Sequence, residues 1–125
     1  GEVDFVTDGA RAARVANGHA IMPQVTALGC ALTGVCGAFL GAGCEPFEGT
    51  VAALAYFGLS GEQAAEGAEG PGSFAVRFLD ALAAIDSAAL DRGARIEILP
   101  APRGGLGRRR HPPKYWRPGR QQHQW

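Results

Sequence analysis

The chain has 125 residues, 46% of them hydrophobic, which is enough for one domain with a modest core. Its three cysteines are too few and too irregularly spaced for a disulfide framework or a zinc site. No signal peptide is recognisable, and the longest apolar run is broken by glycines and too short to cross a bilayer. We therefore expect no membrane partner and a reducing cytoplasm as the location.

The formal net charge of zero conceals a division of charge along the chain. Residues 91–125 carry nine basic and two acidic residues, whereas residues 1–90 carry three arginines and ten carboxylates. Both tryptophans and five of the eight prolines also lie after residue 90. We predict a globular part at residues 1–90 and a basic, disordered Pro/Gly/Arg-rich tail at residues 91–125.

The first 26 residues have the composition of short strands joined by turns. Residues 3–7 and 11–16 predict a hairpin around Asp8-Gly9, because that dipeptide favours a tight hairpin turn. Asn17-Gly18 marks a second turn, and residues 24–26 predict a further short strand. The chain lacks an initiator methionine and begins inside a predicted strand, so we expect it to be a piece of something longer.

A glycine turn then leads into an apolar helix predicted at residues 30–42. A helix that begins at such a turn leaves its first N–H groups unpaired and directs its positive dipole end at the space above, which suits an anion. Cys30 stands at this position, where a helix N-terminus favours the thiolate form of a cysteine. The helix is apolar on every side, so we expect it to be buried. Gly34 and Gly37 each cost it about 1 kcal/mol, which suggests close packing.

Two more helices are predicted downstream. Pro46 suits the first turn of a helix over residues 46–66, with a break near residues 58–61. Residues 67–72 read as a glycine-rich loop, after which Ser73 can cap a third helix. The apolar positions of this third helix recur on one face and read as ordinary core: Phe74, Phe78, Ala81, Leu82 and Ile85.

Other polar residues are weaker candidates for a site. Asp4 and Asp8 flank a strand and could serve a metal or a ribose, although turn chemistry accounts for Asp8. His19 follows a turn and reads as a surface residue rather than a catalyst. Residues 67–73 could approach a nucleotide, with a simple helix cap as the alternative. Cys36 and Cys44 are expected to be small buried residues.

The order hairpin, glycine turn, buried helix and two further helices resembles a known family. Residues 1 to about 86 are similar to the C-terminal part of hydroxyethylthiazole kinases, which belong to the ribokinase-like superfamily. The resemblance rests on blocks in matching order and spacing: Gly1-Glu2-Val3-Asp4, Thr7-Asp8-Gly9, Asn17-Gly18-His19, Val25-Thr26, Gly29-Cys30-Ala31-Leu32-Thr33, Gly37-Ala38-Phe39, Gly70-Pro71-Gly72-Ser73-Phe74 and Phe78-Leu79-Asp80-Ala81-Leu82.

The resemblance implies the C-terminal portion of an α/β, three-layer ribokinase-like fold. It further implies ATP-dependent phosphorylation of the primary hydroxyl of 4-methyl-5-(2-hydroxyethyl)thiazole in thiamine biosynthesis, with Mg²⁺ between the phosphates and the family's homotrimer. Cys30 then occupies the general-base position, and Leu28, Gly29 and Cys30 form the anion hole. Alternatively, positioning and charge neutralisation matter more than a base, and the backbone amides contribute more than the thiol.

This sequence departs from the family pattern just before Gly29. Ala27 stands where the family has its substrate-contacting glycine, so its amide remains but its dihedral range is narrower. Leu28 adds bulk beside the phosphate path. The family's ATP-contacting, metal-site and thiazole-pocket residues precede the position of Gly1, and no metal ligand is predicted in this chain. We therefore expect little or no activity of this chain alone.

Two alternatives remain open. The run Arg108-Arg109-Arg110-His111, with Tyr115, Trp116 and Trp125 interleaved, could bind nucleic acid through phosphate contacts and stacking, although a shifted reading frame explains this tail equally well. A kinase for another vitamin precursor, such as a hydroxymethylpyrimidine, would keep the fold and change the acceptor. Cys30 favours the thiazole enzyme over that alternative.

Overall fold

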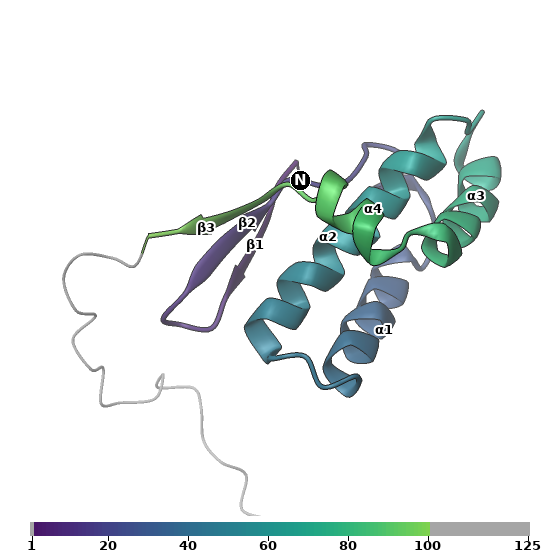
Figure 1. Cartoon of the computed structure of the whole chain (residues 1–125). Helices are drawn as coiled ribbons and strands as arrows, with labels where there is room; N and C mark the ends of the chain where they lie inside the picture. The colour runs from purple at the N-terminus through teal and green to yellow at the C-terminus, as the bar shows by residue number, and fades with distance from the viewer. Residues whose placement is uncertain (1, 101–125) are drawn as a thin grey trace, which may run out of the picture.

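The computed structural model describes residues 2–100, which combine helices with one small sheet (Figure 1). Helix α2 crosses the middle of the fold, with the sheet on one side and α1 and α3 on the other. The elements in chain order are β1 (Asp4–Thr7), β2 (Ala12–Val15), the 3₁₀ helix η1 (Met22–Gln24), α1 (Leu28–Gly41), α2 (Pro46–Ala65), α3 (Pro71–Ala84), α4 (Ser87–Gly93) and β3 (Ile96–Leu99).

The predicted hairpin is confirmed. Strands β1 and β2 pair antiparallel with Val6 opposite Ala13, and the Asp8 carboxylate closes the turn by accepting hydrogen bonds from the backbone N–H groups of Ala10 and Arg11 at 2.9 and 2.7 Å. Turn chemistry therefore accounts for Asp8. Val6, Ala13 and Val15 point inward and are buried against α2.

The structure corrects the predicted boundary after residue 90. Strand β3 pairs antiparallel with β2, which makes the described sheet three-stranded in the order β1-β2-β3. Helix α4 precedes it and is capped by Asp86, whose carboxylate accepts from the Ala89 N–H at 2.7 Å. Residues 91–100 thus belong to the folded part, because Ile96 and Ile98 supply strand-forming residues to a free sheet edge. Residues 101–125 of the predicted tail, including its arginine run, lie outside the described residues.

The short strand predicted at residues 24–26 is wrong. Met22–Gln24 form a 3₁₀ turn instead, in which the N–H of Gln24 donates to Ile21 and that of Val25 donates to Met22, at 3.0 and 3.1 Å. Pro23 explains the outcome, since its fixed φ favours a helical first turn over a strand ladder. Only Val25, at the end of this turn, is extended.

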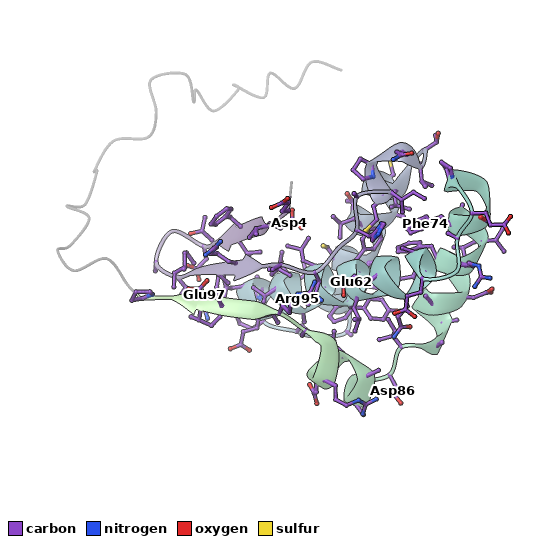
Figure 2. The ribbon with its side chains drawn as sticks, turned by 90° about the horizontal axis from the view of Figure 1, so that it is seen from above. Asp4, Glu62, Phe74, Asp86, Arg95 and Glu97 are labelled. Atoms are coloured by element: carbon purple, nitrogen blue, oxygen red, sulfur yellow. The ribbon has the colours of Figure 1, made fainter. Side chains whose placement is uncertain are left out.

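The core consists of two clusters on opposite sides of α2. One lies under the sheet and comprises Val6, Ala13, Val15, Phe47, Val51 and Ala55. The other lies between α2 and α3 and comprises Phe57, Ala64, Phe74 and Phe78. The Phe57 and Phe78 rings meet edge to face at 4.8 Å between centroids, which confirms the predicted apolar face of the third helix. Phe74, labelled in Figure 2, is fully buried.

Helix α1 is not buried as predicted. It packs on α2 through Leu28, Leu32 and Val35, but none of its residues is fully buried. A Cβ at Gly34 or Gly37 would meet nothing within 4 Å, so neither glycine lies in close contact with another of the described residues, contrary to the prediction. Within residues 2–100, α2 covers one side of α1 and nothing covers the other.

Further details of the predictions need correction. Cys44 is exposed and Cys36 only half-buried, so neither is the fully buried residue expected. Helix α2 continues through residues 58–61 without a break. Helix α3 begins at Pro71, with Gly70 as N-cap, inside the predicted loop. Ser73 therefore caps from inside the helix, its Oγ accepting from the N–H groups of Glu69 and Gly70 at 2.9 and 3.2 Å.

Candidate functional site

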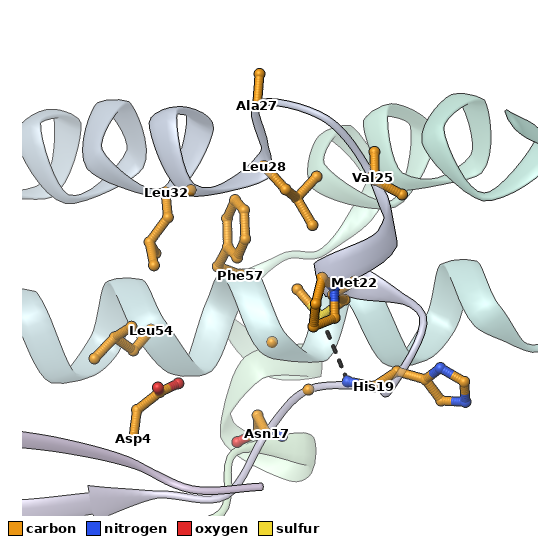
Figure 3. A pocket seen from close by; sticks show the side chains of 14 residues that line it. Asp4, Asn17, His19, Met22, Val25, Ala27, Leu28, Leu32, Leu54 and Phe57 are labelled. Atoms are coloured by element: carbon orange, nitrogen blue, oxygen red, sulfur yellow. Dashed lines mark hydrogen bonds between the residues drawn. The ribbon is translucent and has the colours of Figure 1, made fainter. Parts of the chain in front are cut away.

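A cavity of about 340 Å³ opens between the N-terminus of α1, the middle of α2 and the loop that follows β2 (Figure 3). Its walls are mostly apolar, and its polar groups are few. The lining residues are Asp4, Asn17, Gly18, His19, Met22, Pro23, Val25, Ala27, Leu28, Gly29, Leu32, Leu54, Phe57 and Gly58. Apolar walls with a few converging polar groups are typical of small-molecule sites.

Ala27 makes the turn that starts α1. Its φ of 64° and ψ of 10° are left-handed, and among non-glycine residues of the described part it alone has a positive φ. This conformation costs an L-residue about 1–2 kcal/mol, which explains why glycine suits such a position. Ala27, where this sequence departs from the family pattern, is thus a residue with a strained backbone at the edge of the cavity.

The first amides of α1 are unpaired. The first intrahelical bond runs from the Ala31 N–H to the Ala27 carbonyl at 3.0 Å, and the Ala27 side chain offers no cap. Within residues 2–100, the N–H groups of Leu28, Gly29 and Cys30 have no hydrogen-bond acceptor. Three free N–H donors at a helix N-terminus are an arrangement that can bind an anion.

The structure brings most of the predicted site residues together. Ala27, Leu28 and Gly29 all line the cavity, and Cys30 follows them as the third residue of α1, exposed and outside the lining set. The Leu28 side chain lines the cavity and also packs on the cluster around Phe57. That its bulk lies beside the phosphate path stays a prediction.

Of the weaker candidates, Asp4 and His19 reach the cavity. Asp4 lies on the wall opposite α1 (Figure 3). The His19 ring points away from the cavity in Figure 3, and its Nδ1 accepts from the Ile21 N–H at 3.2 Å. Asp8 lies at the hairpin turn, where the backbone N–H groups of Arg11 and Ala10 lower the pKa of its carboxyl to about 2.

Sequence reasoning missed the α2 side of the cavity. Gly58 and Phe57 form this wall, and a Cβ at Gly58 would stand 2.5 Å from the carbonyl of Asn17. Gly61 lies equally close to Met22, whose Sδ accepts from the His19 N–H at 3.4 Å. The available signal was the pair of glycines inside an otherwise good helix, which indicates a close approach.

The donor set of the cavity fits a phosphate group better than a metal ion. Residues 2–100 contain no group of three or more His, Cys, Asp or Glu that could hold a metal ion. Asp4 is the carboxylate on the cavity wall. Mg²⁺ in kinases is commonly held by one or two carboxylates together with substrate phosphates and waters, so a single carboxylate is compatible with such a role.

Comparisons with known proteins identify the family. The sequence profile described as "Hydroxyethylthiazole kinase family" matches residues 1–88. The chain belongs to the hydroxyethylthiazole kinase family. It is 67% identical over 97 residues to the hydroxyethylthiazole kinase of Cereibacter sphaeroides strain ATCC 17029 and 64% identical over 99 residues to that of Rhizobium etli strain CIAT 652. These alignments cover 78% of this chain but 37% and 38% of the two relatives.

A solved structure agrees with this assignment. The hydroxyethylthiazole kinase of Pyrococcus horikoshii OT3 superposes with a TM-score of 0.76 at 39% identity, covering 80% of this chain and 39% of that one. The resemblance drawn from the sequence blocks is thus confirmed. The chain spans little more than a third of the length of the hydroxyethylthiazole kinases it matches.

Within residues 2–100, no helix is long and apolar enough to cross a membrane.

Proposed function

We propose that this chain forms the corner of a hydroxyethylthiazole kinase site that receives the transferred phosphoryl group. The observation that carries the proposal is the left-handed turn at Ala27, which opens α1 with three unpaired amides beside an apolar cavity. Backbone donors of this kind stabilise charge that develops on a phosphoryl group during transfer. The 67% identity to a named hydroxyethylthiazole kinase supports the same role.

In this proposal the hydroxyl of the thiazole attacks the γ-phosphorus of ATP, ADP leaves, and the hydroxyl proton passes to a base. The amides of Leu28, Gly29 and Cys30 hold the phosphoryl oxygens. The Ala27 backbone contacts the acceptor substrate, and the exposed side chain of Cys30 is the candidate base. Bound Mg²⁺ would neutralise phosphate charge, and Asp4 is the residue of the cavity wall suited to face it.

Several wider features follow from the family as proposals. The whole protein would have a ribokinase-like fold, and this chain would form its C-terminal portion. It would assemble as a homotrimer and act in thiamine biosynthesis in the cytoplasm. The related names favour a thiazole acceptor over a hydroxymethylpyrimidine. Nucleic-acid binding by the arginine run would involve residues outside the described part, so the described cavity does not support it.

The experiment replaces the matching segment of the C. sphaeroides relative with the corresponding residues of this chain. We expect the chimera to phosphorylate hydroxyethylthiazole with ATP and Mg²⁺ at a rate within about tenfold of its parent. Cys30→Ala should lower kcat by about 10–100-fold if Cys30 is the base, since positioned bases contribute at least this much. Cys36→Ala, two turns further along α1, is the matched control and should leave kcat unchanged.

The outcomes separate the two views of Cys30. A folded chimera without activity would contradict the proposed function. An active chimera that tolerates Cys30→Ala would leave the backbone amides as the catalytic element and remove the thiol from the mechanism. The unmodified 125-residue chain, assayed alone, is expected to show little turnover, because it spans 37% of the relative whose segment it replaces.

A further inference from the structure

A polar cluster lies directly behind the cavity wall formed by residues 17–22. We call Asn17, Glu62 and Arg95 the polar clamp. Asn17 is buried with 6% of its surface exposed, and its amide is fully engaged within the described residues. Its Nδ2 donates to the Gly93 carbonyl at 2.9 Å and to Glu62 at 3.2 Å, while its Oδ1 accepts from the Arg95 N–H at 2.7 Å.

Glu62 joins three separate parts of the chain. From α2, its carboxylate accepts from the Gly18 N–H at 2.8 Å, from the Asn17 amide, and from the Arg95 guanidinium, with one Arg95 contact at 3.1 Å. Figure 2 shows Glu62 and Arg95 close together beside α2. Partial burial alone would raise the pKa of Glu62, but the hydrogen bonds from Arg95 and Gly18 outweigh it and lower that pKa, so the carboxylate is ionised at neutral pH.

The clamp acts where α2 approaches the wall most closely. Gly58 admits the Asn17 backbone, and Gly61 admits the Met22 side chain, so the wall rests directly on the helix. Asn17, Gly18 and Met22 line the cavity, whereas Glu62 and Arg95 do not. Any effect of those two charged residues on a bound molecule must therefore pass through the wall.

We infer that Glu62 and Arg95 are positioning residues of this site, holding the wall of residues 17–22 at its distance from the N-terminus of α1. This inference rests on the proposed function, since it assigns the clamp to the same cavity. It also gives a role to Arg95, which lies beyond residues 1–88 matched by the family profile. Arg95 directly precedes β3 and reaches the cavity wall through its N–H, which donates to Asn17, while its guanidinium donates to the neighbouring Ala16 carbonyl at 2.8 Å.

The test measures amide hydrogen exchange by NMR on the full 125-residue chain, together with binding of hydroxyethylthiazole by the chimera that carries this segment in the C. sphaeroides relative. In Glu62→Gln, we expect exchange at Gly18 and Met22 to accelerate about tenfold, the factor that losing one charge-assisted hydrogen bond gives. The Kd for hydroxyethylthiazole should rise about five- to tenfold, a typical coupling between neighbouring groups. Arg95→Gln should behave alike. Glu66→Gln, at the exposed C-cap of α2, should change neither.

Each outcome decides a separate point. Faster exchange at the wall, unchanged exchange at Phe78 in the α3 core, and weaker binding together support the inference. Uniform acceleration across α2 and α3 would show a purely structural role and overturn it, as would unchanged exchange at Gly18. A loosened wall with unchanged affinity would also overturn it. A chimera without these substitutions that binds no hydroxyethylthiazole would contradict the proposed function, and the exchange data would then still decide whether Glu62 holds the wall.

Discussion

Gly58 of α2 lies against the backbone of Asn17 so closely that a Cβ at position 58 would stand 2.5 Å from the Asn17 carbonyl carbon and oxygen. The obstacle is main chain, which cannot rotate aside as a flexible side chain can. The wall of the cavity and the central helix are therefore in backbone contact. The position of the wall depends on the absence of a single methyl group.

We predict that Gly58→Ala destabilises the chain. Relief of the clash requires the helix or the wall to move, and overpacking of this kind costs about 1–3 kcal/mol, more than the gain of about 1 kcal/mol from replacing glycine inside a helix. The free energy of unfolding in urea should fall by up to about 2 kcal/mol. Gly37→Ala in α1 is the matched control, because a Cβ there meets nothing within 4 Å and should raise stability by about 1 kcal/mol. Equal gains at both positions would contradict the contact.

Ala27→Gly is expected to stabilise the protein. The left-handed φ of 64° costs alanine about 1–2 kcal/mol, whereas glycine adopts it freely and loses about 0.5–1 kcal/mol to its more flexible unfolded chain. The net gain should be about 0.5–1 kcal/mol in urea unfolding. Ala42→Gly tests the reverse, since Ala42 has an ordinary φ of −75° and should lose stability. A loss at position 27 would show that the turn is not left-handed.

The comparison of sequence with structure shows what local signals encode. The hairpin around Asp8-Gly9 and the apolar face of α3 were predictable because turn chemistry and helical periodicity are properties of neighbouring residues. The left-handed conformation of Ala27 was not predicted, since alanine gives no local signal for a positive φ and the family resemblance indicated only that glycine usually stands there. The same resemblance brought Leu28 and Gly29 to the site.

What the sequence did not reveal depends on distant contacts. Strand β3 lies in a segment whose arginines and prolines suggested a tail, yet Ile96 pairs with Val15 some 80 positions earlier. The clamp of Asn17, Glu62 and Arg95 has no recognisable spacing, because its members come from helix α2 and two separate loops. The exposed side of α1 was predicted to be buried from composition alone, which does not tell whether a neighbour within the chain covers it.

Acid should weaken the hairpin turn through Asp8. Backbone N–H groups of Arg11 and Ala10 lower the pKa of the Asp8 carboxyl from 3.8 to about 2, so the ionised form is favoured in the folded state. A lowered folded pKa contributes stability that is fully present above pH 3.8 and is lost as pH falls through about 2. The urea midpoint of the unmodified chain should exceed that of Asp8→Ala at pH 7, and the difference should shrink between pH 4 and pH 2.

Asp80→Ala serves as the control for this titration. Asp80 is exposed on α3, and its carboxylate has no hydrogen-bond partner within residues 2–100. Its removal should leave the urea midpoint nearly unchanged at each pH. A difference for Asp8→Ala that persists undiminished at pH 2 would show that the carboxylate stabilises the turn by its shape and not by its charge.

Ligand protection of Cys30 tests whether the N-terminus of α1 is the phosphate site. Cys30 and Cys44 are both exposed, so both thiols should react with iodoacetamide in the chimera with the C. sphaeroides relative, and mass spectrometry resolves the two sites. If the phosphates of ATP occupy the amides of residues 28–30, ATP with Mg²⁺ at ten times its Kd should slow alkylation of Cys30 about tenfold, since only the free fraction reacts. Cys44, beyond the other end of α1, is the internal control and should keep its rate. Equal slowing at both thiols would indicate a general effect of ATP on the chain, and bound ATP that leaves Cys30 fully reactive would place the phosphates elsewhere.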